Sequence, residues 1–177
     1  MKYLFKIFCL TVLTLYSFSA PSLSAEERVI GENQAKAAFV FNVVRYVSWP
    51  PPLSDTVLIG VLGKGPLASE WQGLSGKSLN GKKLKVFKSN EIDEMLDCHI
   101  VIIEETNHQK LSRILLSLKN YPILSIGDSP VFISSGGKLN VSLVNNRISF
   151  TVNLAQARSV GLDISSNLLK LAAEVIK

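Results

Sequence analysis

The feature that most constrains the fold of this chain is a set of short runs that are apolar at nearly every position. The longest covers residues 57–62, two more cover 99–103 and 123–126, and a shorter one covers 84–87. A strand with one wet face alternates apolar and polar residues, whereas a strand buried on both faces gives a continuous apolar run. The runs therefore predict parallel strands in a sheet that helices cover on both sides.

Helical patterns lie between these runs. Residues 66–74 and 109–118 both have the spacing of amphipathic helices, and the second places Leu111, Leu115 and Leu118 on one stripe. Strands that alternate with helices build right-handed βαβ units. The expected fold is a three-layer α/β sandwich of the Rossmann-like or flavodoxin-like kind, with a mostly parallel sheet.

Two further elements flank this alternation. An amphipathic helix is predicted over residues 33–49, ended by the prolines at 50–52. Apolar and polar residues alternate strictly on both sides of Asn145 and Asn146, which predicts an antiparallel hairpin near the C-terminus. Asn suits its two-residue turn because it tolerates the positive φ that the turn requires. The hairpin is expected to extend one edge of the sheet.

The tail over residues 154–177 is predicted to form two helices split at Gly161, with Ser165 or Ser166 capping the second. The buried face of that second helix is expected to comprise Leu168, Leu169, Leu171, Ala172, Val175 and Ile176.

The first 25 residues have the layout of a secretory signal peptide. Two lysines without an acid precede an apolar stretch over residues 7–15, and small residues follow it. The stretch is shorter than the roughly 20 apolar residues that a membrane span needs. Cleavage is expected near Ser24 or Ala25, which leaves residues 26–177 as a single exported α/β domain.

Charge argues against a nucleic-acid partner. The formal net charge is +5, and Lys2 and Lys6 in the leader supply two of these charges. The exported chain is therefore only mildly basic, at about +3, and its lysines are scattered.

The cysteines and histidines predict neither a disulfide nor a metal site. Once Cys9 is removed with the leader, Cys98 has no cysteine to pair with, and its apolar neighbours favour an inert core thiol. His99 and His108 share no metal-ligand spacing with a second cysteine, so no metal or other cofactor is expected.

Catalytic motifs are missing as well, so we do not expect an enzyme. Neither His99 nor His108 neighbours a Gly-x-Ser-x-Gly elbow, and the acidic residues cluster on polar stretches. The glycine-rich turn at 60–65 has neither the Walker spacing nor the three-glycine dinucleotide fingerprint. It is either a bare strand-to-helix turn or a weak anion or nucleotide site.

Polar residues set inside apolar stretches are the candidates for contact with a ligand or a partner. The alternative is that they cap helices or satisfy buried backbone groups. The candidate binding residues are Arg45, Trp49, Asn153 and Arg158; Asn42 and Asn167 share the same pattern.

Several segments together resemble the YfiR-like family of bacterial periplasmic proteins, in order along nearly the whole exported chain. They are residues 36–42 (KAAFVFN), Trp49-Pro50, 59–63 (IGVLG), 98–103 (CHIVII), Gly136-Gly137, 150–158 (FTVNLAQAR) and 161–172 (GLDISSNLLKLA). The resemblance implies a non-enzymatic periplasmic regulator. Its expected partner is an inner-membrane diguanylate cyclase of the YfiN type, which it represses through the periplasmic sensor region so that envelope signals control cyclic-di-GMP and biofilm formation.

The chain departs from this family at one position. Relatives carry a cysteine where Gly60 stands here, able to pair with the counterpart of Cys98, so that bridge cannot form in this chain. A homodimer fits such a small regulator. The alternative function is a periplasmic receptor for a nucleotide or an amino acid, bound at the carboxyl ends of the strands near residues 63–65.

Overall fold

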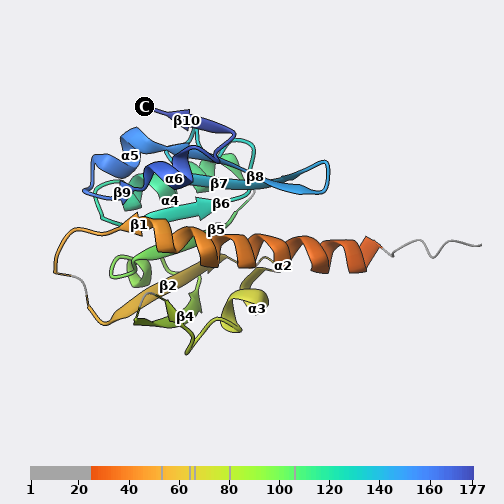
Figure 1. Cartoon of the computed structure of the whole chain (residues 1–177), viewed down its shortest axis with the longest axis horizontal. Helices are drawn as coiled ribbons and strands as arrows, with labels where there is room; N and C mark the ends of the chain where they lie inside the picture. The colour runs from red at the N-terminus through yellow and green to blue at the C-terminus, as the bar shows by residue number, and fades with distance from the viewer. Residues whose placement is uncertain (1–24, 53, 64, 66, 80, 106) are drawn as a thin grey trace, which may run out of the picture.

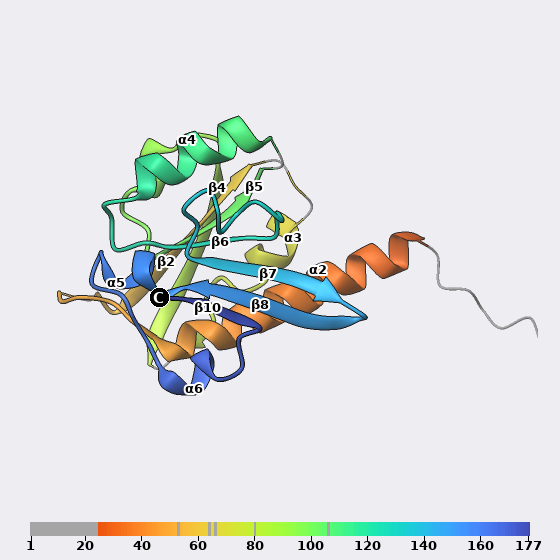
Figure 2. The ribbon, with the colours of Figure 1, turned by 90° about the horizontal axis from the view of Figure 1, so that it is seen from above.

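The computed structural model describes residues 25–177, apart from 53, 64, 66, 80 and 106, and shows a sheet between layers of helices (Figures 1 and 2). Residues 1–24 of the predicted signal peptide lie outside the described residues. The sheet has eight strands in the order β10-β8-β7-β6-β5-β2-β4-β3. Its strands are β2 (Thr56–Gly63), β3 (Ser78–Leu79), β4 (Lys82–Ser89), β5 (Ile100–Glu104), β6 (Leu124–Gly127), β7 (Leu139–Val144), β8 (Arg147–Asn153) and β10 (Glu174–Ile176).

The centre of the sheet confirms the predicted fold class. Strands β4, β2, β5, β6 and β7 lie side by side and are all parallel. If these five strands are numbered by their order along the chain, their order across the sheet is 2-1-3-4-5, which is the strand order of flavodoxin-like folds. Each of the four apolar runs in the sequence overlaps one of these strands.

Helices cover both faces of the sheet, as the continuous runs predict. Helices α2 (Ala25–Val43) and α3 (Leu67–Gln72) pack on one face, and α4 (His108–Leu118) packs on the other (Figure 2). Each face of the sheet has its own hydrophobic core, and successive residues of β5 point into opposite cores. Ile102 packs in the core on the α2 side, and Val101 packs in the core on the α4 side. None of the helices in the described part of the chain is long and apolar enough to cross a membrane.

Helix α4 forms where its apolar stripe predicts. The Asn107 side chain caps its start by accepting the Lys110 N–H at 3.0 Å. Leu111, Leu115 and Leu118 are all buried. Burying a leucine side chain stabilises a fold by about 1.5–3 kcal/mol, so this stripe fixes the helix to the sheet.

The C-terminal hairpin is also confirmed. Asn145 and Asn146 adopt φ values of 49° and 60° between β7 and β8, which pair antiparallel. The hairpin extends the sheet beyond β6, and its tip projects alongside the N-terminal half of α2 (Figure 2).

The predicted helix over 33–49 is wrong at its end. Helix α2 stops at Val43, and a short 3-10 turn η1 (Val44–Tyr46) leads to strand β1 (Val47–Ser48). β1 pairs antiparallel with β9 (Asp163–Ile164). The Ser165 N–H also donates to the Tyr46 carbonyl at 2.9 Å, so a partner more than a hundred residues away ends the helix before the prolines do.

The predicted second tail helix is wrong as well. After α5 (Leu154–Arg158), Gly161 separates the two helices as expected, with a φ of 78°. Ser165 then caps α6 (Ser166–Leu169). The helix ends there, and the chain becomes strand β10, which pairs with β8. The open edge of β8 supplies backbone partners, and Val175 and Ile176 are β-branched residues that suit a strand. Leu171, predicted to be buried, is 75% exposed.

Gly60 faces Cys98 across the core under α4. A Cβ added to Gly60 would overlap the Met95 sulfur and lie 2.9 Å from Cys98 Sγ. The Met95 side chain therefore fills the space beside Gly60, the position where the family resemblance implies a cysteine in relatives.

We predict that Gly60→Ala destabilises the protein by about 1–3 kcal/mol, because it overpacks a filled core. Chemical denaturation measures the change in the free energy of unfolding. Gly31→Ala is the matched control: its Cβ meets nothing within 4 Å, and replacing glycine inside a helix should stabilise the protein by about 0.5–1 kcal/mol. An equal effect of both substitutions would show that packing around Gly60 is not the cause.

Candidate functional site

Two of the four predicted binding residues are exposed cations. Arg45 lies in the 3-10 turn after α2, with its guanidinium carbon 5.5 Å from the centre of the Phe41 ring. Arg158 ends α5 and is also exposed. Both therefore present charge to solvent, as a partner-binding residue must.

Trp49 instead has a structural contact. Its Nε1–H donates to the His99 carbonyl at 3.0 Å, and the two rings meet edge to face. The Leu58 N–H donates to His99 Nδ1 at 3.1 Å, so the imidazole accepts at this nitrogen and is neutral. Burial, aided by the positive charge of Lys82, lowers the pKa of His99. The group joins the linker after β1 to the starts of β2 and β5.

Asn153 caps α5. Its side-chain oxygen accepts the Gln156 N–H at 3.1 Å, and the residue is buried at the end of β8. This is the structural role that the sequence offered as the alternative to binding.

The four residues lie toward the same end of the molecule. The pairing of β1 with β9 brings the segment that carries Arg45 and Trp49 next to the segment that follows Arg158. Among the described residues, no hydrogen bond or ion pair joins the four side chains to one another. The structure therefore places them at one end without assembling them into a pocket.

The glycine-rich turn after β2 is packed against an acid. A Cβ on Gly63 would lie 2.6 Å from the Glu104 carbonyl oxygen, and a Cβ on Gly65 would lie 2.8 Å from the Glu104 carboxylate carbon. Both glycines are thus required by the close approach of β5. The Glu104 backbone and side chain thus pack closely against this turn, which supports a strand-to-helix turn over an anion site.

An ion cluster around the buried Lys36 lies where α2 crosses the carboxyl end of β6, and its two carboxylates are partly exposed. Lys36 Nζ is 2.6 Å from Glu32 and 3.1 Å from Asp128, which is 92 residues away. Burial alone would lower the pKa of Lys36, but the hydrogen bonds and charges of both carboxylates outweigh it and raise that pKa. The cluster fixes the position of α2 over the sheet.

Beneath Lys36 the core leaves a small cavity of about 20 Å³, the space of one water molecule. Apolar side chains of β5, β6 and β7 line it, together with Trp71, whose buried Nε1–H has no hydrogen-bond acceptor among the described residues. The cavity is too small for an amino acid or a nucleotide.

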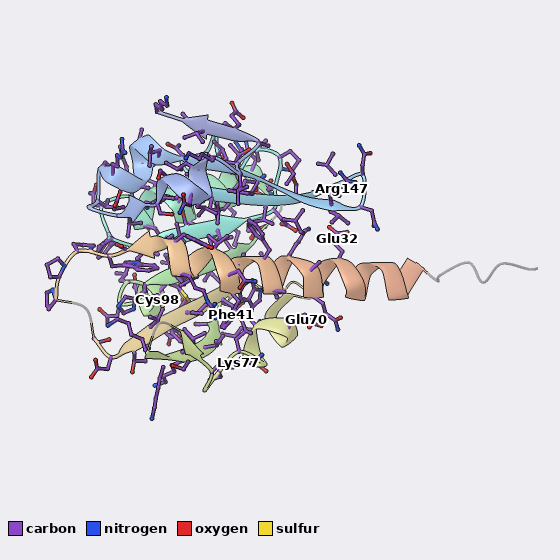
Figure 3. All side chains as sticks on the ribbon, viewed as in Figure 1. Glu32, Phe41, Glu70, Lys77, Cys98 and Arg147 are labelled. Atoms are coloured by element: carbon purple, nitrogen blue, oxygen red, sulfur yellow. The ribbon has the colours of Figure 1, made fainter. Side chains whose placement is uncertain are left out.

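An open groove of about 510 Å³ lies between α2 and α3. We call it the α2–α3 groove. It is lined by Gln34, Ala37, Ala38, Phe41, Asn42, Glu70, Gly73, Leu74 and Lys77. Figure 3 shows Phe41, Glu70 and Lys77 together on this side of the molecule. The sequence pointed to this face only through Asn42 and Arg45, because α3 meets α2 through tertiary packing alone.

A second groove, of about 380 Å³, lies on the opposite face of the sheet. We call it the α4 groove, and it is lined by Ser112, Leu115, Leu116, Lys119, Ser134, Ser135, Gly136 and Gln156.

Lys138 lies directly before β7 and is buried. This burial lowers its pKa to about 8.

Groups that could perform chemistry are dispersed. Burial, with a contribution from Asp97, raises the pKa of the buried Cys98 thiol to about 11, which favours the core-thiol interpretation of the sequence. Within the part of the chain that the structure describes, no three His, Cys, Asp or Glu residues are grouped as metal ligands.

The chain matches a known protein family and is similar in fold to solved structures. The sequence model of a family described as YfiR/HmsC-like matches residues 33–173. A search of curated proteins gave no match. The fold is similar to that of the ABC domain from Streptococcus pneumoniae in complex with L-Trp, with a TM-score of 0.54 and 11% identity over 82% of this chain. It is also similar to a conserved domain protein from Vibrio cholerae O1 biovar El Tor, with a TM-score of 0.52 and 8% identity over 81%.

This chain spans 60% of the length of each of these two structures. At such low identity the likeness shows the fold alone.

We predict that acid destabilises the protein through His99. Because folding lowers the pKa of this residue, its contribution to stability is present above the unfolded value of about 6.5 and is lost as the pH falls through the folded value. His99→Asn keeps an oxygen acceptor for the Leu58 N–H but cannot be protonated there. Denaturation curves between pH 7 and pH 5 should therefore be flatter for His99→Asn than for the wild type.

Gln109→Asn provides the control, since it changes an exposed residue that does not titrate and should leave the pH dependence of the wild type unchanged. A His99→Asn variant that loses stability with acid as steeply as the wild type would contradict the assignment.

We predict that Asn153→Ala costs about 1 kcal/mol of stability, because it removes the cap of α5. Asn153→Asp keeps the accepting oxygen and should recover most of this loss. Thermal denaturation of the two variants checks the prediction. If both variants melt like the wild type, the cap contributes nothing and a binding role for Asn153 becomes the better explanation.

Proposed function

The chain belongs to the YfiR/HmsC-like family, and we propose that it is a periplasmic, non-enzymatic protein that binds and represses an inner-membrane diguanylate cyclase. Members of this family are periplasmic regulators of diguanylate cyclases. The match over residues 33–173 is the observation that carries the proposal, because it includes most of α2 and every strand except β10.

The geometry supports binding better than catalysis. The ionisable groups with shifted pKa values, among them Lys36, Cys98 and His99, each have a packing role or lie apart from one another. The open features are grooves and exposed cations, which are typical of a surface that docks a protein.

Repression then depends on a difference in affinity. A bound regulator shifts a membrane enzyme toward its inactive state only if it binds that state more tightly than the active one. An envelope signal relieves repression if it weakens this preference. The exposed residues Arg45 and Arg158 are our candidates for contact with the cyclase. The protein could make this contact either as a monomer or as a homodimer.

The second candidate function is a receptor for an amino acid or a nucleotide. The cavity under Lys36 at the carboxyl ends of β5 and β6 does not support it, because its volume of about 20 Å³ holds a single water molecule. The similar fold from Streptococcus pneumoniae is a complex with L-Trp, and at 11% identity that likeness concerns the fold. A thermal-shift screen with amino acids and nucleotides tests this candidate, since a ligand that binds only the folded state raises the melting temperature.

We predict that deleting the gene raises cyclic-di-GMP in the source strain, because an active cyclase is no longer held inactive. A plasmid copy of the full chain should restore the low level. A copy that lacks residues 2–24 should not, because the protein would remain in the cytoplasm away from the periplasmic region of its partner. Mass spectrometry of extracted nucleotides gives the measurement, and an unchanged level in the deletion strain would reject the proposal.

A further inference from the structure

The α2–α3 groove has the form of a site for a helix. Its lining includes the small residues Ala37, Ala38 and Gly73, which leave space between the two helices, and its apolar surface comes from Phe41 and Leu74. An amphipathic helix that lays its apolar face into a groove between helices is a recurrent mode of protein recognition. The lining from Gln34 to Asn42 spans about 12 Å along α2, or roughly two helical turns.

The two ends of this groove carry opposite charge. Lys77 lies beside Phe41 toward the C-terminal end of α2, whereas Glu70 lies toward its N-terminal half (Figure 3). Arg45 adds a second cation at the Phe41 end, since its guanidinium stacks on that ring. The groove is therefore basic at one end and acidic at the other.

These charges are not neutralised within the described part of the chain. The ion pairs there involve Lys36 with Glu32 and Asp128, and Lys110 with Glu105. None of them includes Arg45, Glu70 or Lys77. The charges at both ends are thus available to a partner and can set its direction.

We propose that the α2–α3 groove receives an amphipathic helix of the regulated membrane protein, running antiparallel to α2. Acidic residues in the first turn of that helix meet Arg45 and Lys77, and a basic residue in its last turn meets Glu70. This inference rests on the proposed regulatory function. Acidic residues near the N-terminus and basic residues near the C-terminus also complement the helix dipole, so the same charges stabilise the bound helix.

A second copy of this chain is the competing occupant. In a symmetric dimer each subunit would have to place a ridge of its own in the groove of the other. We assign the groove to a helix of the partner because its two oppositely charged ends complement the first and last turns of a helix.

The first test measures repression in cells. Ala38→Trp places a large side chain in the groove at an exposed position, and Arg45→Glu with Lys77→Glu reverses one charged end. Ser112→Trp and Lys119→Glu make the matched changes in the α4 groove on the opposite face. In the deletion strain, we expect the two α2–α3 groove variants to leave cyclic-di-GMP at the deletion level and the two α4 groove variants to restore repression. Melting temperatures confirm that each variant is folded.

The outcomes separate the two proposals. If deletion itself leaves cyclic-di-GMP unchanged, the regulatory function fails. If deletion raises it but the α2–α3 groove variants repress like the wild type, the function holds and the docking site is wrong.

The second test measures direction with two synthetic amphipathic peptides of about 12 residues and identical composition. One has glutamates in its first turn and lysines in its last turn, and the other has the reverse order. We expect the first to bind the exported chain about tenfold more tightly by fluorescence anisotropy. The preference should reverse in the Arg45→Glu and Lys77→Glu double variant.

Equal binding of the two peptides, or no binding of either, would overturn the proposed orientation. Analytical ultracentrifugation of the wild type and of Ala38→Trp tests whether a second copy of this chain occupies the groove. A dimer that Ala38→Trp converts to a monomer would assign the groove to a second copy and reject a partner helix.

Discussion

Burial of the central strands on both faces is the constraint on which the rest of this structure depends. β5 and β6 have no face that water can wet, so helices must cover the sheet on two sides. Helix α4 meets this need with a leucine stripe. Helix α2 meets it with Ala37, Val40 and Val43, and its position over the sheet is fixed by the contact of Lys36 with Asp128 at the end of β6.

The two ends of the sheet are closed in different ways. At the amino ends of the parallel strands, the chain after α2 is held by β9 and by the Trp49 and His99 contact. At the carboxyl ends, Gly63 and Gly65 allow the turn after β2 to approach Glu104 closely. Many α/β proteins hold nucleotides in the crevice at this end of the sheet. In this chain the Glu104 side chain packs against the turn beside that crevice, so the fold by itself does not imply that a nucleotide binds there.

A protein built in this way can act through its surface. Two of its buried polar residues have structural roles: Asn153 caps a helix, and Lys36 joins an element near the N-terminus to the sheet. Charge without an ion-pair partner among the described residues remains at the α2–α3 groove, with Glu70 on α3, Lys77 after α3 and Arg45 in the turn after α2. Because such charges add to affinity only when a partner supplies the opposite sign, they favour specific docking over nonspecific association.

The sequence by itself determined the elements whose reasons are local or periodic. The apolar runs identified the parallel strands, the stripe at Leu111, Leu115 and Leu118 identified α4, and Asn145 and Asn146 identified the hairpin turn. The resemblance of the segments also identified the family, since it depends on residue order.

Only the tertiary structure decided the elements whose partners lie far along the chain. The end of α2 at Val43 depends on β9, and the strand at Val175 and Ile176 depends on the open edge of β8. The α2–α3 groove and the Lys36 cluster likewise join residues that the sequence keeps far apart. Hydrogen bonds and ion pairs between distant segments leave no periodic trace in a single sequence, which is why periodicity found the core and could not find the groove.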